Sequence, residues 1–131
     1  MKDLVFTNGC FDIIHRGHLE LFRFCKSLGK KLVVGLNSDE SIERLKGANR
    51  PINNVDDRKF MLESLIFVDE VIVFSEDTPY NLIKIVNPDV IVKGGDYKVS
   101  EVVGKDLCEV VIFNYVKGYS TTKTIQSIIN R

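Results

Sequence analysis

Two histidines, His15 and His18, are the only imidazoles in the 131 residues, and they stand three residues apart in the stretch TNGCFDIIHRGH. At the expected start of a helix, they project from neighbouring faces and can converge on one ligand. Gly17 between them lets that ligand approach the backbone, and Gly9 suits a tight turn after the first strand. Because a helix N-terminus offers unpaired N–H groups and partial positive charge, the natural ligand is a phosphate.

The spacing of these histidines is by itself a weak signal, and two other interpretations compete with it. Both side chains could be ordinary surface or core histidines. They could also bind a metal, but no third histidine exists and no cysteine lies at a ligand spacing, which disfavours a zinc site. The residues around the two histidines are therefore needed to distinguish these interpretations.

Composition predicts a single folded domain over residues 1–131, since 44% of the residues are hydrophobic and 27% are charged. Eighteen basic and eighteen acidic side chains cancel, so no overall field attracts nucleic acid or a membrane surface. No apolar run reaches the ~20 residues of a membrane span, and the N-terminus lacks a secretory pattern, so we expect a cytoplasmic protein. The cysteines fit neither a disulfide framework nor a zinc site, and Cys25 and Cys108 read as core thiols.

Short apolar segments rich in Val, Ile and Phe alternate with amphipathic segments along the whole chain, a pattern typical of α/β proteins with a parallel sheet. The predicted strands are 4–7, 31–36, 70–74, 90–92 and 109–113. The predicted helices are 18–28, 39–45, 57–65, 79–86 and 121–129. Right-handed crossovers then give a three-layer Rossmann-like sandwich with a five-stranded parallel sheet.

Helix ends and loops add detail to this prediction. Gly29 is a natural stop for the first helix, Thr78 before Pro79 predicts an N-cap, and Ser120 can cap the last helix. Asp39 could be a plain N-cap after the second strand. Four segments, 8–17, 37–39, 94–104 and 114–120, should meet beyond the carboxyl ends of the strands, where ligands bind in such folds.

The N-terminal stretch resembles the T-x-G-x-F-D-x-x-H-x-G-H signature of the cytidylyltransferase-like branch of the nucleotidyltransferase superfamily. In that family both imidazoles contact the α- and β-phosphates of a nucleoside triphosphate and stabilise the charge that develops during the reaction. The resemblance implies catalytic roles for His15 and His18. It implies nucleotide contacts for Thr7, Asn8, Gly9, Cys10, Phe11, Asp12 and Gly17. Asp12 is expected to be buried and to order the loop, and Cys10 to contribute its backbone N–H rather than its thiol.

Further family landmarks follow in the expected order, each with an ordinary alternative. Lys46 resembles a catalytic lysine that reaches the phosphates, although it could be a solvated lysine at a helix end. Arg58 suits phosphate contact or ordering of the site, or could pair with Asp56 or Asp57. In the loop 93–106, which could also be a flexible connection, the resemblance places Gly95, Asp96 and Tyr97 beside the nucleotide. The GYSTT segment implies phosphate contacts from Gly118, Ser120 and Thr121.

Three segments, LNSDESIERLKGANRP, FSEDTP and PDVIVKGGDY, resemble the adenylyltransferase domain of bifunctional ADP-heptose synthases more than the glycerol-3-phosphate cytidylyltransferases. Tyr115 stands where cytidylyltransferases carry an arginine that helps to bind the nucleotide, although Lys117 offers a charge nearby. The implied reaction transfers AMP from ATP to a sugar 1-phosphate, with heptose 1-phosphate as the expected acceptor, and gives ADP-sugar and pyrophosphate.

The resemblance also implies Mg²⁺ held mainly by the triphosphate, with no protein ligand assigned to it. The expected partners are ATP and a sugar phosphate, without nucleic acid or membrane, and a homodimer is one expectation because relatives often dimerise. The alternative enzyme is a CTP-dependent glycerol-3-phosphate or other polyol-phosphate cytidylyltransferase. A non-catalytic nucleotide-binding module is disfavoured, because both histidines, Lys46 and the hydroxyl segment are all present.

Overall fold

The structure, a computed structural model, describes residues 2–114 and 121–130. Every strand and helix expected from the sequence is present, together with one short 3-10 helix that was not expected. In chain order the elements are β1 (Lys2–Gly9), α1 (Arg16–Leu28), β2 (Gly29–Asn37), α2 (Asp39–Lys46), α3 (Val55–Glu63), β3 (Glu70–Phe74), α4 (Tyr80–Val86), β4 (Val90–Gly94), η1 (Val99–Glu101), β5 (Glu109–Phe113) and α5 (Thr121–Ile129).

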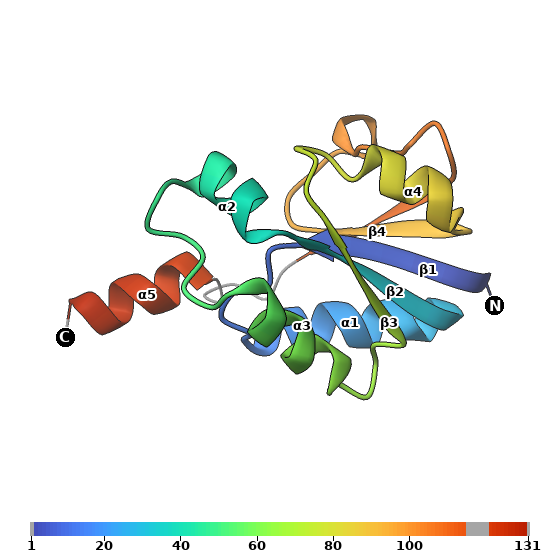
Figure 1. The fold of residues 1–131 in the computed structure, drawn as a ribbon. Helices are drawn as coiled ribbons and strands as arrows, with labels where there is room; N and C mark the ends of the chain where they lie inside the picture. The colour runs from blue at the N-terminus through green and yellow to red at the C-terminus, as the bar shows by residue number, and fades with distance from the viewer. Residues whose placement is uncertain (1, 115–120, 131) are drawn as a thin grey trace.

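The five strands form one parallel sheet in the order β3-β2-β1-β4-β5, which confirms the predicted α/β fold. Figure 1 shows α1 and α3 on one face of the sheet and α4 on the other. Along the chain, β2 and β3 are added on one side of β1, and β4 and β5 are then added on its other side. The carboxyl ends of β1 and β4 therefore flank the switch point where open α/β sheets bind their ligands.

Two apolar layers enclose the sheet because successive strand residues point to opposite faces. On β1, Val5 belongs to the layer beneath α1, whereas Phe6 belongs to the layer beneath α4. Gly35 on β2 makes room for the Phe6 ring, since a Cβ atom there would lie 2.8 Å from it. Cys25 is fully buried in the first layer, and the half-buried Cys108 packs against the second, as expected for core thiols.

Side-chain caps explain where α1 and α2 begin, and the starts of α1, α2 and α4 correct three predictions. His15 caps α1, which starts at Arg16 rather than at residue 18. Ser38 caps α2 by accepting a hydrogen bond from the Ser41 N–H, so Asp39 is not the N-cap. Before α4, Pro79 occupies the N-cap position without a side-chain hydrogen bond, and the predicted cap by Thr78 is wrong.

The C-terminal helix α5 lies beyond the carboxyl ends of the strands in Figure 1, rather than over either face of the sheet. Its predicted cap, Ser120, lies outside the described residues. Within the described ranges, no helix has both the length and the apolar character needed to cross a bilayer.

Candidate active site

A cavity of about 840 Å³ opens at the carboxyl ends of β1, β2, β3 and β4, at the switch point of the sheet. Its volume lies in the range of small-molecule sites. The structure brings ten of the predicted site residues to its walls. They are Asn8, Gly9, Cys10, Phe11, Asp12, His18, Lys46, Gly95, Asp96 and Tyr97.

The two histidines form a reciprocal capping box at the start of α1. The Gly17 backbone N–H donates to His15 Nδ1 at 3.1 Å, and the His15 backbone N–H donates to His18 Nδ1 at 3.3 Å. His15 therefore precedes the helix, whereas the sequence placed both side chains on its first turn. The rings stack, with centroids 3.8 Å apart and planes inclined by 21°. Of the pair, His18 lines the cavity, and His15 stacks on the His18 ring.

This capping arrangement fixes the protonation of both imidazoles. An Nδ1 atom that accepts a hydrogen bond carries no hydrogen, so in the neutral ring the hydrogen resides on Nε2. Burial, aided by the nearby charges of His15 and Lys46, lowers the pKa of His18 to about 3. Burial also lowers the pKa of His15. At neutral pH the pair is uncharged, and each ring can donate one hydrogen bond from Nε2, as a phosphate oxygen requires.

The Phe11 ring packs against His18 of the histidine pair. Its φ of 44° is unusual for a residue with a side chain, and its ring meets the His18 ring edge-on at 5.2 Å and the Phe22 ring at 5.0 Å. Gly9 ends β1 instead of forming a turn. A Cβ atom at Gly9 would lie 2.9 Å from the Phe11 ring, so the glycine is needed for this packing.

Asp12 is buried and orders the segment between α2 and α3. Its Oδ2 accepts from the Ile52 N–H at 2.7 Å and its Oδ1 from the Asn53 N–H at 2.8 Å. Asn53 Nδ2 donates to the Asp12 carbonyl at 2.9 Å. The expected ordering role is thus visible, and the backbone that Asp12 holds comes from forty residues further along the chain.

Arg58 is completely buried and holds four segments together without lining the cavity. Its Nη1 donates to the carbonyls of Cys10 at 2.9 Å and Asn37 at 2.8 Å. Its Nη2 donates to the Asp39 carboxylate at 2.7 Å, and its Nε to the Asn53 carbonyl at 2.9 Å. The expected alternative of a pair with Asp56 or Asp57 is wrong, and of the two site roles the geometry favours ordering.

Other expected nucleotide contacts lie elsewhere. The Thr7 hydroxyl is buried and donates to the Val92 carbonyl at 2.8 Å, which ties β1 to β4. The Gly17 N–H is used by the His15 cap. Gly118 and Ser120 lie outside the described residues, as do Tyr115 and Lys117. Thr121 begins α5.

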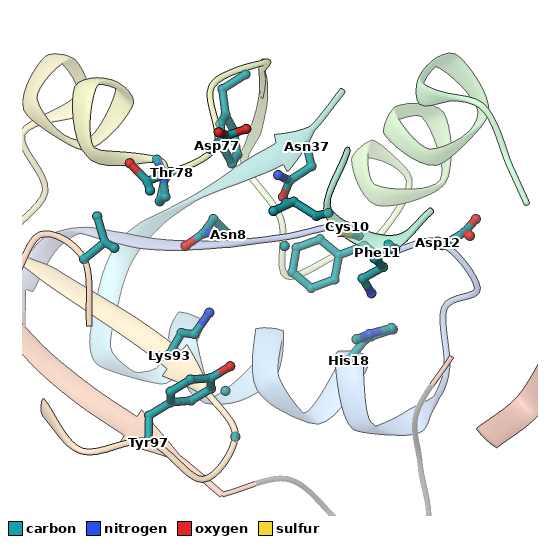
Figure 2. Close-up of a pocket in the computed structure, with 18 of the residues that line it drawn as sticks. Asn8, Cys10, Phe11, Asp12, His18, Asn37, Asp77, Thr78, Lys93 and Tyr97 are labelled. Carbon is teal, nitrogen blue, oxygen red and sulfur yellow. The ribbon is translucent and has the colours of Figure 1, made fainter. Parts of the chain in front are cut away.

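Five polar residues of the cavity wall were not named as site residues, namely Asn37, Arg50, Asp77, Thr78 and Lys93, although the segment that begins at Asn37 was expected at this edge of the sheet. Figure 2 shows Asn37, Asp77 and Thr78 on one side of the cavity and Lys93 and Tyr97 on the other. Lys93 Nζ lies 4.9 Å from the centre of the Tyr97 ring, and burial lowers the pKa of Lys93. A polar residue inside or directly after an apolar strand was the available signal for Asn37 and Lys93.

The cavity is suited to a polyanion. Lys46, Arg50 and Lys93 bring positive charge beside the carboxylates of Asp12, Asp77 and Asp96, and His18 adds a neutral donor. The Asp12 carboxylate is occupied by backbone N–H groups, and Asp77 Oδ1 accepts from Arg44 Nε at 3.1 Å. In the part of the chain described here, no three His, Cys, Asp or Glu side chains gather in a way that could hold a metal ion.

Comparisons with known proteins agree with this geometry. A cytidylyltransferase-like family model matches residues 6–127. The bifunctional protein HldE of a Nitratiruptor species is 56% identical over 126 residues, which cover 95% of this chain and 27% of that protein. HldE of Campylobacter concisus (strain 13826) is also 56% identical, over 97% of this chain and 27% of that protein. The chain thus spans about a quarter of the length of these curated relatives.

Solved structures extend the comparison. The lipopolysaccharide core biosynthesis protein from Thermoplasma volcanium GSS1 has a TM-score of 0.73 and 30% identity, and the match covers 92% of this chain and 100% of that chain. A bifunctional NMN adenylyltransferase/ADP ribose pyrophosphatase from Francisella tularensis shares only the fold, with a TM-score of 0.67, 19% identity, and coverage of 99% of this chain and 42% of that chain. With the signature histidines at the cavity and the family model matched along nearly the whole chain, this protein belongs to the cytidylyltransferase-like family and is a nucleotidyltransferase.

Proposed function

We propose that this chain transfers AMP from ATP to a sugar 1-phosphate, with heptose 1-phosphate as the acceptor, and releases ADP-sugar and pyrophosphate. The observation that carries the proposal is the stacked pair of His15 and His18, which offers neutral donors beside a cavity that also contains Lys46. The choice of an adenylyl donor and a sugar acceptor rests on the likeness to HldE proteins at 52–56% identity.

The chemical step is an in-line displacement at the α-phosphorus. A phosphate oxygen of the acceptor forms a new P–O bond, while the bond to the pyrophosphate oxygen breaks and that oxygen leaves with the electron pair. His15 and His18 donate to oxygens of the α- and β-phosphates, where negative charge grows in the transition state. Lys46 balances the charge of the departing pyrophosphate. Such catalysis depends on positioning and on fixed donors, with no covalent enzyme intermediate.

The substrates would occupy different walls of the cavity. Gly95 and Asp96, after β4, form the wall proposed for the nucleoside. Asn37, Asp77 and Thr78, after β2 and β3, supply hydrogen-bonding groups suited to sugar hydroxyls. Arg58 would act as a positioning residue, since its Nη1 holds together the carbonyls of Cys10 and Asn37, which both line the cavity.

Mg²⁺ is proposed to enter with the nucleotide. The ion commonly takes its ligands from phosphates and water, and it would shield charge on the triphosphate. The donor set supports this arrangement because His18 and Lys46, the cavity side chains proposed to reach the phosphates, would bind phosphate oxygens rather than the ion. We therefore propose no protein ligand for Mg²⁺.

A panel of substrates tests the proposal. Pyrophosphate release is measured with ATP, CTP and GTP, each against heptose 1-phosphate, glycerol 3-phosphate and FMN. We expect kcat/KM with heptose 1-phosphate to be at least about ten-fold higher for ATP than for CTP, a difference of ~1.4 kcal/mol. A clear preference for CTP with glycerol 3-phosphate would establish the cytidylyltransferase alternative. ATP binding without turnover in every combination would indicate a non-catalytic module.

A further inference from the structure

Arg50 is a buried arginine with two unused hydrogen-bond donors. It lies between α2 and α3, it lines the cavity, and only 14% of its side chain is exposed. Its Nε and Nη2 atoms are buried, and among the described residues neither has a hydrogen-bond partner. Buried polar atoms without partners are rare in folded proteins, and a missing ligand is one of their established causes.

Asp12 neutralises part of the charge of Arg50 without satisfying its donors. The nearer carboxylate oxygen, Oδ2, is 3.5 Å from Nε, within ion-pair range but beyond a good hydrogen bond. Both oxygens of Asp12 already accept shorter hydrogen bonds, from the backbone N–H groups of Ile52 and Asn53. Asp12 thus stabilises the position of the guanidinium, while the N–H groups of Nε and Nη2 remain available to another acceptor.

The segment that carries Arg50 is held in place from both sides. The Arg50 backbone N–H donates to the Gly47 carbonyl at 3.2 Å, and Gly47 has a φ of 100°, which favours glycine. On the other side, Asp12 binds the backbone of Ile52 and Asn53. The guanidinium is therefore already positioned before a ligand arrives, which lowers the entropic cost of binding.

We propose that Arg50 binds a phosphate group of a substrate through Nε and Nη2. These atoms share one edge of the guanidinium, so their N–H groups point the same way and can hold two oxygens of one phosphate. Lys46, four residues earlier, lines the same cavity and adds a second cation for that phosphate. The proposal rests on the proposed function in one respect: the phosphate belongs either to the nucleotide or to the sugar phosphate.

The test compares Arg50→Gln with the wild type and with a matched control, Arg23→Gln, which removes an exposed arginine from the outer surface of α1. Calorimetry measures the Kd for ATP and for pyrophosphate, kinetics measures the KM for heptose 1-phosphate, and thermal denaturation checks folding. At an unchanged Tm, we expect Arg50→Gln to weaken at least one of these by about ten-fold or more, as expected for a lost charged hydrogen bond. Arg23→Gln should change none.

The calorimetric and the kinetic measurements together identify which substrate carries the phosphate. A higher Kd for ATP or pyrophosphate assigns Arg50 to the nucleotide, whereas a higher KM for heptose 1-phosphate at an unchanged Kd for ATP assigns it to the acceptor. If Arg50→Gln does not fold, Arg50→Lys is measured instead. The lysine keeps the positive charge but lacks the two parallel N–H groups of the guanidinium, so binding should still weaken by about three-fold. Values within two-fold of the wild type for every ligand in a folded variant overturn the proposal.

Failure of the proposed function would look different. If the wild type binds pyrophosphate but produces no ADP-sugar, the proposed reaction is wrong. Weaker pyrophosphate binding by Arg50→Gln would still support Arg50 as a phosphate ligand in that case. Conversely, normal ADP-sugar synthesis with unchanged binding and KM in Arg50→Gln would leave the reaction intact and remove Arg50 from it.

Discussion

Replacement of His15 by asparagine or by alanine separates its two roles, the cap of α1 and the donation to phosphate. Asparagine is a preferred N-cap, so its side-chain oxygen can replace Nδ1 as the acceptor for the Gly17 N–H. Alanine offers no acceptor. We expect His15→Ala to lose ~1 kcal/mol of stability, which lowers Tm by about 4 °C in a domain of this size, and His15→Asn to lose much less.

Both variants should lose catalysis to a similar extent, because alanine has no donor and the amide of asparagine, shorter than the imidazole and engaged in the cap, does not reach the position of Nε2. Removal of one donor of this kind costs about 10²–10³ in kcat, or ~2.7–4 kcal/mol, when it acts on charge that develops in the transition state. The Kd for ATP should change by less than about five-fold, since the interaction with the ground state is weaker. His18→Ala should show the same separation between kcat and ATP binding.

The assays are thermal denaturation, calorimetric titration of ATP, and steady-state pyrophosphate release with heptose 1-phosphate. A near-normal kcat in His15→Asn would refute the role as donor. An equal loss of Tm in the asparagine and alanine variants would refute the capping argument.

Three further predictions concern the supporting residues. Arg58→Met should lower the free energy of unfolding, measured by urea denaturation, by about 3–5 kcal/mol, since it leaves three backbone carbonyls without their charged donor; a loss below about 1 kcal/mol would contradict the ordering role. Because the pKa of folded His18, about 3, lies below its unfolded value of 6.5, the unfolded chain binds more protons between these values and stability falls as the pH is lowered through this window. The free energy of unfolding, measured between about pH 3 and pH 6.5, should change by up to ~1.4 kcal/mol per pH unit. This slope should be smaller in His18→Gln, and identical slopes in the two proteins would disprove the contribution of His18. Cys10→Ser should retain activity within about ten-fold, measured as kcat/KM, and a greater loss would show that the thiol takes part.

The fold was largely predictable because its signals are local. Strands β3 and β5 have the bounds that were predicted, 70–74 and 109–113, each with a glutamate followed by four apolar residues. Errors occur where a side chain, rather than periodicity, decides the end of an element. His15 is an uncommon N-cap, and its hydrogen bond to the Gly17 N–H starts α1 earlier than the apolar pattern indicates.

The sequence by itself determined where the two histidines lie, because the residues that place them fall within one short stretch, from Gly9 to His18. The spacing of His15 and His18 predicted two imidazoles at one helix start, whereas the Phe11 ring over Gly9 was visible only in the structure, because the sequence indicated a turn at Gly9. The position of the imidazoles depends on local geometry, which short-range patterns encode.

Only the tertiary structure decided which distant side chains complete the site. Arg58 reaches Cys10, which is 48 residues away, Thr7 reaches Val92 across 85 residues, and Arg50 lies beside Asp12. The parallel sheet brings the carboxyl ends of its strands to one edge, but the loops that follow them have no periodicity that would show which side chains turn inward. Their positions are fixed by long-range hydrogen bonds, such as those from Ile52 and Asn53 to Asp12, and these form only when the chain has folded.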